Sequence, residues 1–243
     1  MSKPDVIFFD VGSTLLTGMN AKPAKYIVHM LGMDMALIPE VENFLYTTCC
    51  YTAESLFSEF YSKFKEHFTG KTKVKSYHEG QRILQYLWDT NITTAKPIDG
   101  AITSFKWATE LTNVSIVSNA WQPLRTAFDV FFSRDEDYDF NVDYWSFAQK
   151  ETKPTLLSKV VDNLKGNLID PATCVMVGDN YDNDIKPALD LGMKAVWVLH
   201  RESVNQSKHD ISNSNLTTIN NISELSKWPF LNKFGYYPQN KGN

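Results

Sequence analysis

Three apolar runs of this sequence each end in residues that could do chemistry. Asp10 follows the first run, Ser118 and Asn119 follow the second, and Gly178 and Asp179 follow the third. In an open parallel sheet, ligands bind beyond the carboxyl ends of the strands, so we expect these distant residues to meet at one edge. Each residue taken alone is also typical of a turn or a helix cap. The coincidence of all three favours one functional site.

The third cluster is rich in acids, because Asp179, Asp182 and Asp184 stand within six residues. Carboxylates this crowded repel one another unless a cation or protonation relieves them. A hard divalent cation such as Mg²⁺ prefers oxygen ligands and keeps several waters, so it fits such a cluster, and a substrate phosphate could complete its shell. The alternative is a helix N-terminus at which the acids favour the helix dipole, although capping itself uses one side chain.

The elements that must position these residues can be read from the apolar pattern. Runs without polar alternation predict strands buried on both faces, at 6–9, 114–117, 174–177 and 195–199, with an edge strand around 216–219. Helical patterns cover 154–166, with Pro154 suited to the first turn, and about 183–191, where Pro187 requires the helix to begin within the preceding turn. Strands alternating with helices indicate an α/β fold, a Rossmann-like doubly wound parallel sheet.

Residues 17–97 differ, because apolar and aromatic side chains recur there at helical spacing without clear strands. The stripes are Leu56, Phe57, Phe60, Tyr61, Phe64 and Phe68; Ile83, Leu84, Leu87 and Trp88; and Ile27, Met30 and Leu31. We interpret them as the core of a helix bundle rather than as a ligand box. The predicted domains are therefore an all-helical insertion at 17–97 and a core made of 1–16 and 98–243, joined through linkers at 16–22 and 90–97.

Four motifs in this order resemble those of the haloacid dehalogenase-like hydrolase superfamily. They are "DVGSTL" at 10–15, "SNA" at 118–120, Lys153 with Pro154, and "GDNYDND" at 178–184. The last motif is the most specific of them. The resemblance spans the predicted sheet domain, and it implies that the inserted helical domain is a cap.

The resemblance also implies a magnesium-dependent mechanism. Asp10 would attack phosphorus and form an aspartyl-phosphate, which splits one hard displacement into two. The metal ligands would be Asp10, the backbone carbonyl of Gly12 and Asp179, with Asp184 binding directly or through water.

Four further residues receive roles from the same resemblance. Ser118 and the backbone at Asn119 would donate hydrogen bonds to the transferring oxygens, and Lys153 would offset charge on Asp10 and the phosphoryl group. Lys150 is a weaker candidate for the lysine position. Thr14 lies where family members hold the turn after the nucleophile, and we assign it to substrate binding.

Gly12 departs from the family pattern, because most phosphatases of the family carry a second Asp there. A glycine keeps the carbonyl for metal binding but removes general acid–base help worth roughly 10²–10⁴ in rate. A cap residue could lend the acid instead, and the candidates are His29, Asp34, Glu40, Glu54 and His78.

Three functions remain open. The favoured one is a Mg²⁺-dependent phosphomonoester phosphatase of a small metabolite, with weak or specialised activity. The alternative is a catalytically impaired protein that binds phosphate and Mg²⁺ in a binding or interaction role. The third is a 2-haloacid dehalogenase, since those relatives also lack the second Asp, but they need no metal, and "GDNYDND" resembles the metal-dependent branch.

Composition limits the partners. The 243 residues are 43% hydrophobic and carry a net charge of −4, without the basic stripe that nucleic-acid binding requires. No apolar stretch is long enough to span a membrane, and the N-terminus lacks a signal-peptide layout. Three cysteines without a C-x-x-C pair are expected to stay reduced. We therefore expect a cytoplasmic protein, monomeric or homodimeric, whose partner is a small phosphorylated metabolite.

Overall fold

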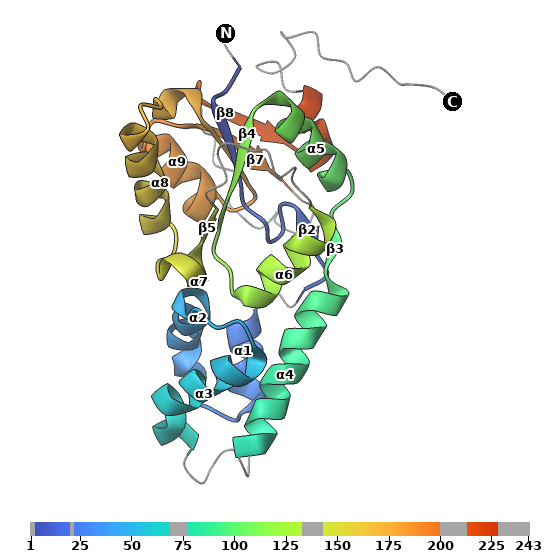
Figure 1. The fold of residues 1–243 in the computed structure, drawn as a ribbon, viewed down its shortest axis with the longest axis vertical. Coiled ribbons are helices and arrows are strands. Elements are labelled where there is room, and N and C mark those ends of the chain that lie inside the picture. Colours follow the sequence, from blue (N-terminus) through green and yellow to red (C-terminus); the bar gives the residue numbers. More distant parts are fainter. Residues whose placement is uncertain (1–2, 20–21, 69–76, 133–142, 200–212, 228–243) are drawn as a thin grey trace, which may run out of the picture.

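The fold is built on a parallel sheet, as the apolar runs predict. The structure, a computed structural model, describes residues 3–19, 22–68, 77–132, 143–199 and 213–227. Six parallel strands form the sheet in the order β5 (Tyr144–Trp145), β4 (Asn113–Ser118), β1 (Val6–Phe9), β6 (Val175–Gly178), β7 (Lys194–Val198) and β8 (Leu216–Ile219). The order places the first strand of the chain in the interior of the sheet, between β4 and β6 (Figure 1).

Helices cover both faces of this sheet, because alternate residues of each strand point to opposite sides. In β1, Ile7 and Phe9 belong to one apolar cluster while Val6 and Phe8 belong to another. The first cluster also holds side chains of α5 (Ala101–Leu111) and α6 (Gln122–Phe131). The second holds side chains of α8 (Thr155–Gly166) and α9 (Lys186–Asp190). The sheet is therefore doubly wound, with a Rossmann-like α/β architecture.

All the predicted strands are present, and the two predicted core helices need small corrections. The helix predicted at 154–166 is α8, with Pro154 as its N-cap. The one predicted at about 183–191 is shorter, because a π-helical turn, η4 (Tyr181–Ile185), precedes α9. Pro187 lies in the first turn of α9, which follows directly on η4. Two short helices, α7 (Ser146–Gln149) and η3 (Pro171–Thr173), complete this region.

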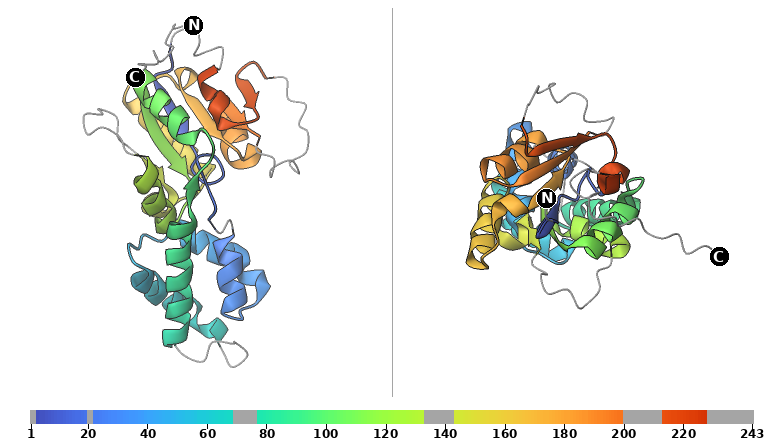
Figure 2. Two further views of the ribbon diagram at one scale, coloured as in Figure 1. Left: turned by 90° about the vertical axis from the view of Figure 1, so that its right-hand side faces the viewer. Right: turned by 90° about the horizontal axis from the view of Figure 1, so that it is seen from above.

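Most of the predicted insertion is helical. Its elements are α1 (Pro23–Met30), η1 (Met35–Leu37), α2 (Ile38–Thr47), α3 (Ala53–Phe64), η2 (Lys65–Phe68) and α4 (Tyr77–Thr94). The helices share a buried apolar cluster that also takes in Trp121, which precedes α6. They form the lower part of the molecule in Figure 1, and the sheet forms the upper part. Figure 2 shows the same separation from the side.

The aromatic stripes do form core, with local exceptions. Phe57, Phe60 and Phe64 of α3 are almost completely buried, as is Trp88 of α4. Met30 is 37% exposed, because it lies on the last turn of α1, so its place in the predicted stripe was wrong.

The junction between the helices and the sheet is a small antiparallel ribbon of β2 (Leu16–Thr17) and β3 (Lys96–Pro97). We predicted a linker from 90 onward, but α4 continues to Thr94. Gly18, at φ +85°, passes so close to Thr94 that a Cβ there would lie 2.3 Å from its carbonyl oxygen. Strand pairing and this close approach bring the two connections together. The predicted domain boundaries at 16/17 and 97/98 fall in this ribbon and stay a prediction.

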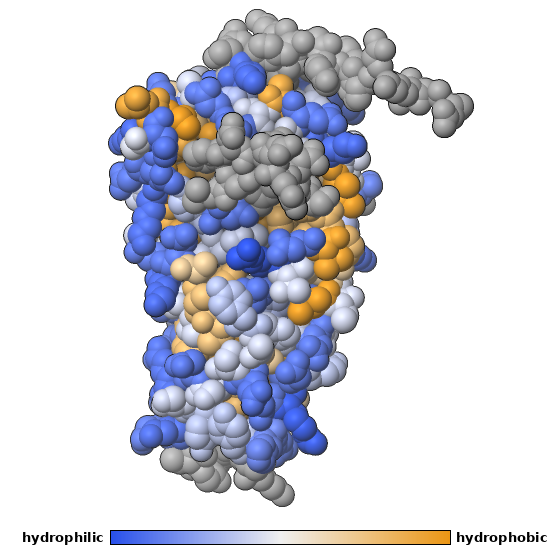
Figure 3. Space-filling view, viewed as in Figure 1, coloured by the Kyte–Doolittle hydropathy of each residue, from blue (hydrophilic) through white to orange (hydrophobic). Residues whose placement is uncertain are grey.

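The surface over the helical part is mostly hydrophilic. In Figure 3 it is largely blue to white, and hydrophobic residues gather higher up, on the right of the view over α5 and α6. Within the described ranges, no helix is long and apolar enough to cross a lipid bilayer. The last element described is a short helix, η6 (Ile222–Lys227).

Candidate functional site

The three predicted clusters meet because their strands are neighbours. β1 lies between β4 and β6, so Asp10, Ser118 and Asp179 come from adjacent strand ends although up to 169 positions separate them in the chain. The Asp10 N–H donates to the Val177 carbonyl at 2.9 Å, which continues the β1–β6 pairing one residue past β1. The site therefore forms at the carboxyl edge of the sheet, where ligands bind in folds of this kind.

Asp10 is 6% exposed, and three side chains hold its carboxylate. Its Oδ1 accepts hydrogen bonds from Ser118 Oγ at 3.0 Å and from Lys153 Nζ at 2.8 Å. Its Oδ2 lies 3.3 Å from Thr14 Oγ1, which also lies 3.3 Å from Asp179 Oδ1. Thr14 has one hydroxyl proton to donate, so it can serve either carboxylate but not both fully.

Lys153 is the cation that binds this cluster together. Its ammonium group is buried and donates to both Asp10 and Asp184. Burial lowers the pKa of the lysine, but the two carboxylates more than reverse this effect and raise it. The Asn119 side chain accepts a hydrogen bond from the Lys153 backbone N–H at 2.8 Å, so the second motif holds the third in place. Lys150 is exposed at the end of α7, so the structure places the weaker lysine candidate away from Asp10.

A tight turn after β6 brings Asp184 into the site. The Asn180 side chain caps η4 by accepting from the Asn183 N–H, and the Asp184 Oδ2 accepts from the Asn180 N–H at 3.0 Å. Asp184 lies directly against Gly178, at which a Cβ would approach the Asp184 Oδ2 to 2.5 Å. The absence of a side chain at Gly178 is therefore what lets Asp184 lie beside the strand end. Asp182, in the same turn, is exposed and takes no part.

Asp10, Asp179 and Asp184 form a cluster suited to a metal. Carboxylate oxygens of Asp10, Asp179 and Asp184 lie within 4.8 Å of one another. Burial, reinforced by Asp10 and Asp184, raises the pKa of Asp179 to about 8. Burial also raises the pKa of Asp184 to about 6, although Lys153 opposes this shift. One lysine does not neutralise three buried carboxylates, and a donor set made only of hard oxygens fits a divalent cation such as Mg²⁺.

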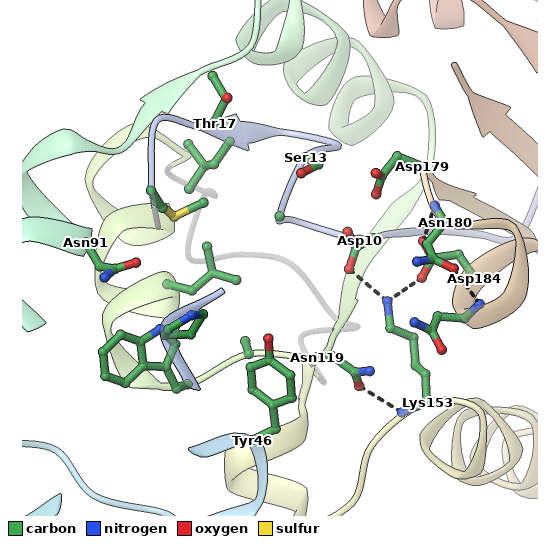
Figure 4. Close-up of a pocket in the computed structure, with 18 of the residues that line it drawn as sticks. Asp10, Ser13, Thr17, Tyr46, Asn91, Asn119, Lys153, Asp179, Asn180 and Asp184 are labelled. Atoms are coloured by element: carbon green, nitrogen blue, oxygen red, sulfur yellow. Dashed lines mark hydrogen bonds and ion pairs between the residues drawn. The ribbon is translucent and has the colours of Figure 1, made fainter. Parts of the chain in front are cut away.

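A cavity of about 330 Å³ opens beside this cluster (Figure 4). Asp10, Gly12, Asn119, Lys153, Asp179 and Asp184 line it, as expected for a binding site. Thr14 and Ser118 are completely buried and are not among its lining residues. Their hydroxyls contact carboxylates instead, so the predicted contact of Thr14 with substrate stays a prediction.

The helical part contributes lining residues that the sequence did not single out. Tyr46 of α2 and Asn91 of α4 line the cavity. The five candidate acids of the cap, His29, Asp34, Glu40, Glu54 and His78, are exposed and do not line it. Burial, together with Glu42 and Asp10, raises the pKa of Tyr46 to about 12 against the effect of Lys153. A helical stripe predicts which side chains are buried. Only the packing of α2 and α4 over the strand ends separates the residues that line the cavity from those of the core.

The fold and site define a member of a known hydrolase family. Residues 4–192 match the haloacid dehalogenase-like hydrolase family, so the chain belongs to it. No curated protein matches the chain. The described acidic cluster, the lysine and the strand-end serine fall within the matched segment.

Solved structures share the fold at low identity. A 2-haloacid dehalogenase from Pseudomonas syringae is 15% identical, with 96% of this chain and 100% of that chain covered and a TM-score of 0.54. A predicted phosphoglycolate phosphatase from Haemophilus somnus is 16% identical, with coverage of 93% and 98% and a TM-score of 0.55. A family enzyme from Bacteroides thetaiotaomicron, solved with magnesium and inorganic phosphate, is 14% identical, with coverage of 80% and 94% and a TM-score of 0.52. These similarities establish the fold and do not separate phosphatase from dehalogenase.

The Gly178–Asp184 contact can be tested with a single methyl group. We expect Gly178→Ala to displace Asp184 and to weaken Mg²⁺ binding at least tenfold by isothermal titration calorimetry, since ligand orientation sets metal affinity. Gly166→Ala is the control, because a Cβ there meets nothing within 4 Å. Equal Mg²⁺ affinity of the two variants would contradict this account of the turn.

The raised pKa of Asp179 predicts how stability depends on pH without metal. An Asp in the unfolded chain titrates near ~3.9, below the folded value of about 8, so the folded protein binds this proton more tightly. The resulting stabilisation is present at low pH and is lost as pH rises through about 8. In chelator, we expect Asp179→Asn to reduce the fall in unfolding free energy between pH 5 and 8.5 by at least about 1.4 kcal/mol, the equivalent of one pKa unit.

Urea titrations across this pH range measure the effect. Asp182→Asn is the matched control, because this exposed acid lies in the same turn. If both variants keep the pH slope of the wild type, Asp179 is not held protonated by the site.

Proposed function

We propose that this protein is a Mg²⁺-dependent phosphomonoesterase that acts on a small metabolite through an aspartyl-phosphate on Asp10. The observation that carries the proposal is the buried Asp10 carboxylate, held by Ser118 and Lys153 within 4.8 Å of two further carboxylates. A cavity of about 330 Å³ lies at the lower end of the ~300–1,000 Å³ typical of small-molecule sites. This size supports a small substrate.

Asp10, Asp179 and Asp184 would hold the cation. We assign the Gly12 carbonyl as the fourth metal ligand. The Leu16 N–H donates to the Val11 carbonyl, and the Leu16 carbonyl accepts from the Ser13 N–H, so this pairing does not use the Gly12 carbonyl. When bound, Mg²⁺ supplies charge stabilisation for the phosphoryl oxygens.

The residues of the chain divide the remaining work. A carboxylate oxygen of Asp10 bonds to phosphorus while the bond from phosphorus to the leaving oxygen breaks, and water then releases phosphate and restores Asp10. Lys153 forms an ion pair with Asp10 and offsets charge on the transferring group. Ser118 and Thr14 orient the Asp10 carboxylate, since their hydroxyls contact it from the buried side. The Asn119 side chain fixes the Lys153 backbone.

The leaving oxygen needs a proton, and Gly12 has none to offer. Tyr46 is the titratable side chain of the described helical part that lines the cavity, and a pKa near 12 keeps it protonated but makes it a weak acid. The proposal therefore includes slow turnover of esters with poor leaving groups. The missing acid at Gly12 also favours a second function, that of a protein that binds Mg²⁺ and phosphate but does not hydrolyse an ester.

Dehalogenation is disfavoured by the charges in the cavity. A 2-haloacid carries a carboxylate that needs a cation, and among the described lining residues Lys153 is the one cation. Its ammonium already serves Asp10 and Asp184. A cluster of three acids, by contrast, suits chemistry that uses a divalent cation.

Phosphate release tests the proposed function. With p-nitrophenyl phosphate and a panel of metabolite monoesters, we expect release that requires Mg²⁺ and falls about 10³-fold or more in Asp10→Asn, which corresponds to about 4 kcal/mol in the barrier. Mg²⁺-dependent binding of phosphate or a metallofluoride without release would instead favour the binding protein. Chloride release from a 2-haloacid without metal would favour the dehalogenase.

Restoring an acid at Gly12 tests the explanation for weak activity. A Cβ at Gly12 would meet nothing closer than Leu124 Cδ2 at 3.9 Å, so the cavity has room for a side chain. We expect Gly12→Asp to raise kcat for alkyl phosphates at least about tenfold, as general acid catalysis supplies roughly 10²–10⁴, with a smaller gain for p-nitrophenyl phosphate. Gly12→Asn is the isosteric control, and an equal gain in it would show that the proton is not what is missing.

A further inference from the structure

The cavity has a charged part and an uncharged part. Its charged lining residues, Asp10, Lys153, Asp179 and Asp184, all belong to the strand-end cluster (Figure 4). Every other described residue that lines it is uncharged. The charged part is where the phosphoryl group would lie, so the uncharged part is left for the leaving group.

The uncharged part has an apolar side. Trp121 and Leu124, at the start of α6, line it together with Met19 and Pro23 from the first connection to the helices. Trp121 is held by an edge-to-face contact with Trp88 of α4, with ring centroids 5.7 Å apart. This side favours carbon rather than charge.

Two polar groups face the same space from the helical part. The Tyr46 hydroxyl makes no hydrogen bond with the described residues, and Figure 4 shows it pointing into the cavity. Asn91 is 2% exposed, and its Nδ2 donates to the Leu87 carbonyl at 2.8 Å. Asn91 lines the cavity, and its Oδ1 accepts no hydrogen bond from the described residues. It can therefore accept one from a ligand hydroxyl.

Neither sign of charge on a leaving group would find a partner here. Among the described lining residues, an anion beside the apolar side would find no cation there, because Lys153 bonds to Asp10 and Asp184 and the proposed Mg²⁺ would lie at the acidic cluster. A cation would find no carboxylate among them outside that cluster. Transferring an unpaired charge out of water is far more costly than transferring a hydroxyl that gains hydrogen bonds.

We propose that the substrate is the phosphate ester of an uncharged hydroxylated alcohol, whose hydroxyl groups bond to Tyr46 or Asn91. This inference rests on the proposed phosphomonoesterase function. It excludes esters of hydroxy acids and amino alcohols as preferred substrates.

Three monoesters of nearly equal size test the proposal. They are 2-hydroxyethyl phosphate, phosphoglycolate and phosphoethanolamine, which differ in a terminal hydroxyl, carboxylate or ammonium group. With Mg²⁺, we expect kcat/KM for 2-hydroxyethyl phosphate to exceed that for each charged ester at least about tenfold. An equal or higher value for either charged ester would overturn the proposal.

Two variants connect the preference to residues. Tyr46→Phe is expected to lower kcat/KM severalfold more for 2-hydroxyethyl phosphate than for n-propyl phosphate, which lacks the hydroxyl. Met19→Lys adds a cation to the uncharged part and is expected to raise the ratio of phosphoglycolate to 2-hydroxyethyl phosphate, compared with Met19→Gln. If neither ratio moves, these residues do not select the leaving group and the proposal is wrong.

A binding measurement separates this inference from the function beneath it. We expect Asp10→Asn to bind 2-hydroxyethyl phosphate more tightly than the charged esters in calorimetry with Mg²⁺. Selective binding by Asp10→Asn, with no turnover by the wild type, would contradict the phosphomonoesterase and keep the charge preference. Turnover of all three esters at equal kcat/KM would contradict the charge preference and keep the phosphomonoesterase.

Discussion

Crowding of three carboxylates around one buried lysine is the interaction on which the site depends. Lys153 bonds to Asp10 and Asp184, and Asp179 is left with a pKa raised to about 8. Buried charges are stable only when they are paired or bind a cation, so this cluster is poised to take up a proton or a metal. The same arrangement keeps Asp10 next to a cation, as the proposed phosphoryl transfer would require.

The surrounding fold holds the cluster through short, specific contacts. The strand order β4–β1–β6 brings three strand ends together, and the π-helical turn after β6 returns Asp184 to the Gly178 backbone. Asn119 ties the loop before α8 to the end of β4. The Trp197 indole N–H donates to the Asp179 carbonyl at 2.9 Å, so β7 supports the same loop. The apolar side of the cavity, formed by Met19, Pro23, Trp121 and Leu124, takes no part in these contacts.

This division suggests how substrate preference and chemistry can vary independently. The charged part is formed by the sheet, and its residue types are those expected for phosphoryl transfer. In the proposed mechanism, Gly12 would weaken protonation of the leaving oxygen and would still offer its backbone carbonyl to a metal. Tyr46 and Asn91 come from helices that contribute nothing to the acidic cluster, so changes there would alter the leaving group and leave the nucleophile in place.

Much of this protein follows from its sequence alone. Unbroken apolar runs predict strands buried on both faces, and the polar residues that end them are then expected at one edge of a parallel sheet. This reasoning found Asp10, Asn119, Asp179 and Asp184, and the motif order indicated the family, whose resemblance added Lys153. It did not predict that Tyr46 and Asn91 line the cavity, or that the Thr14 hydroxyl contacts the Asp10 and Asp179 carboxylates. A side chain's place in a cavity depends on how separate elements pack. Buried Phe44 and cavity-lining Tyr46, both aromatic residues of α2, cannot be told apart until α2 is placed over the strand ends.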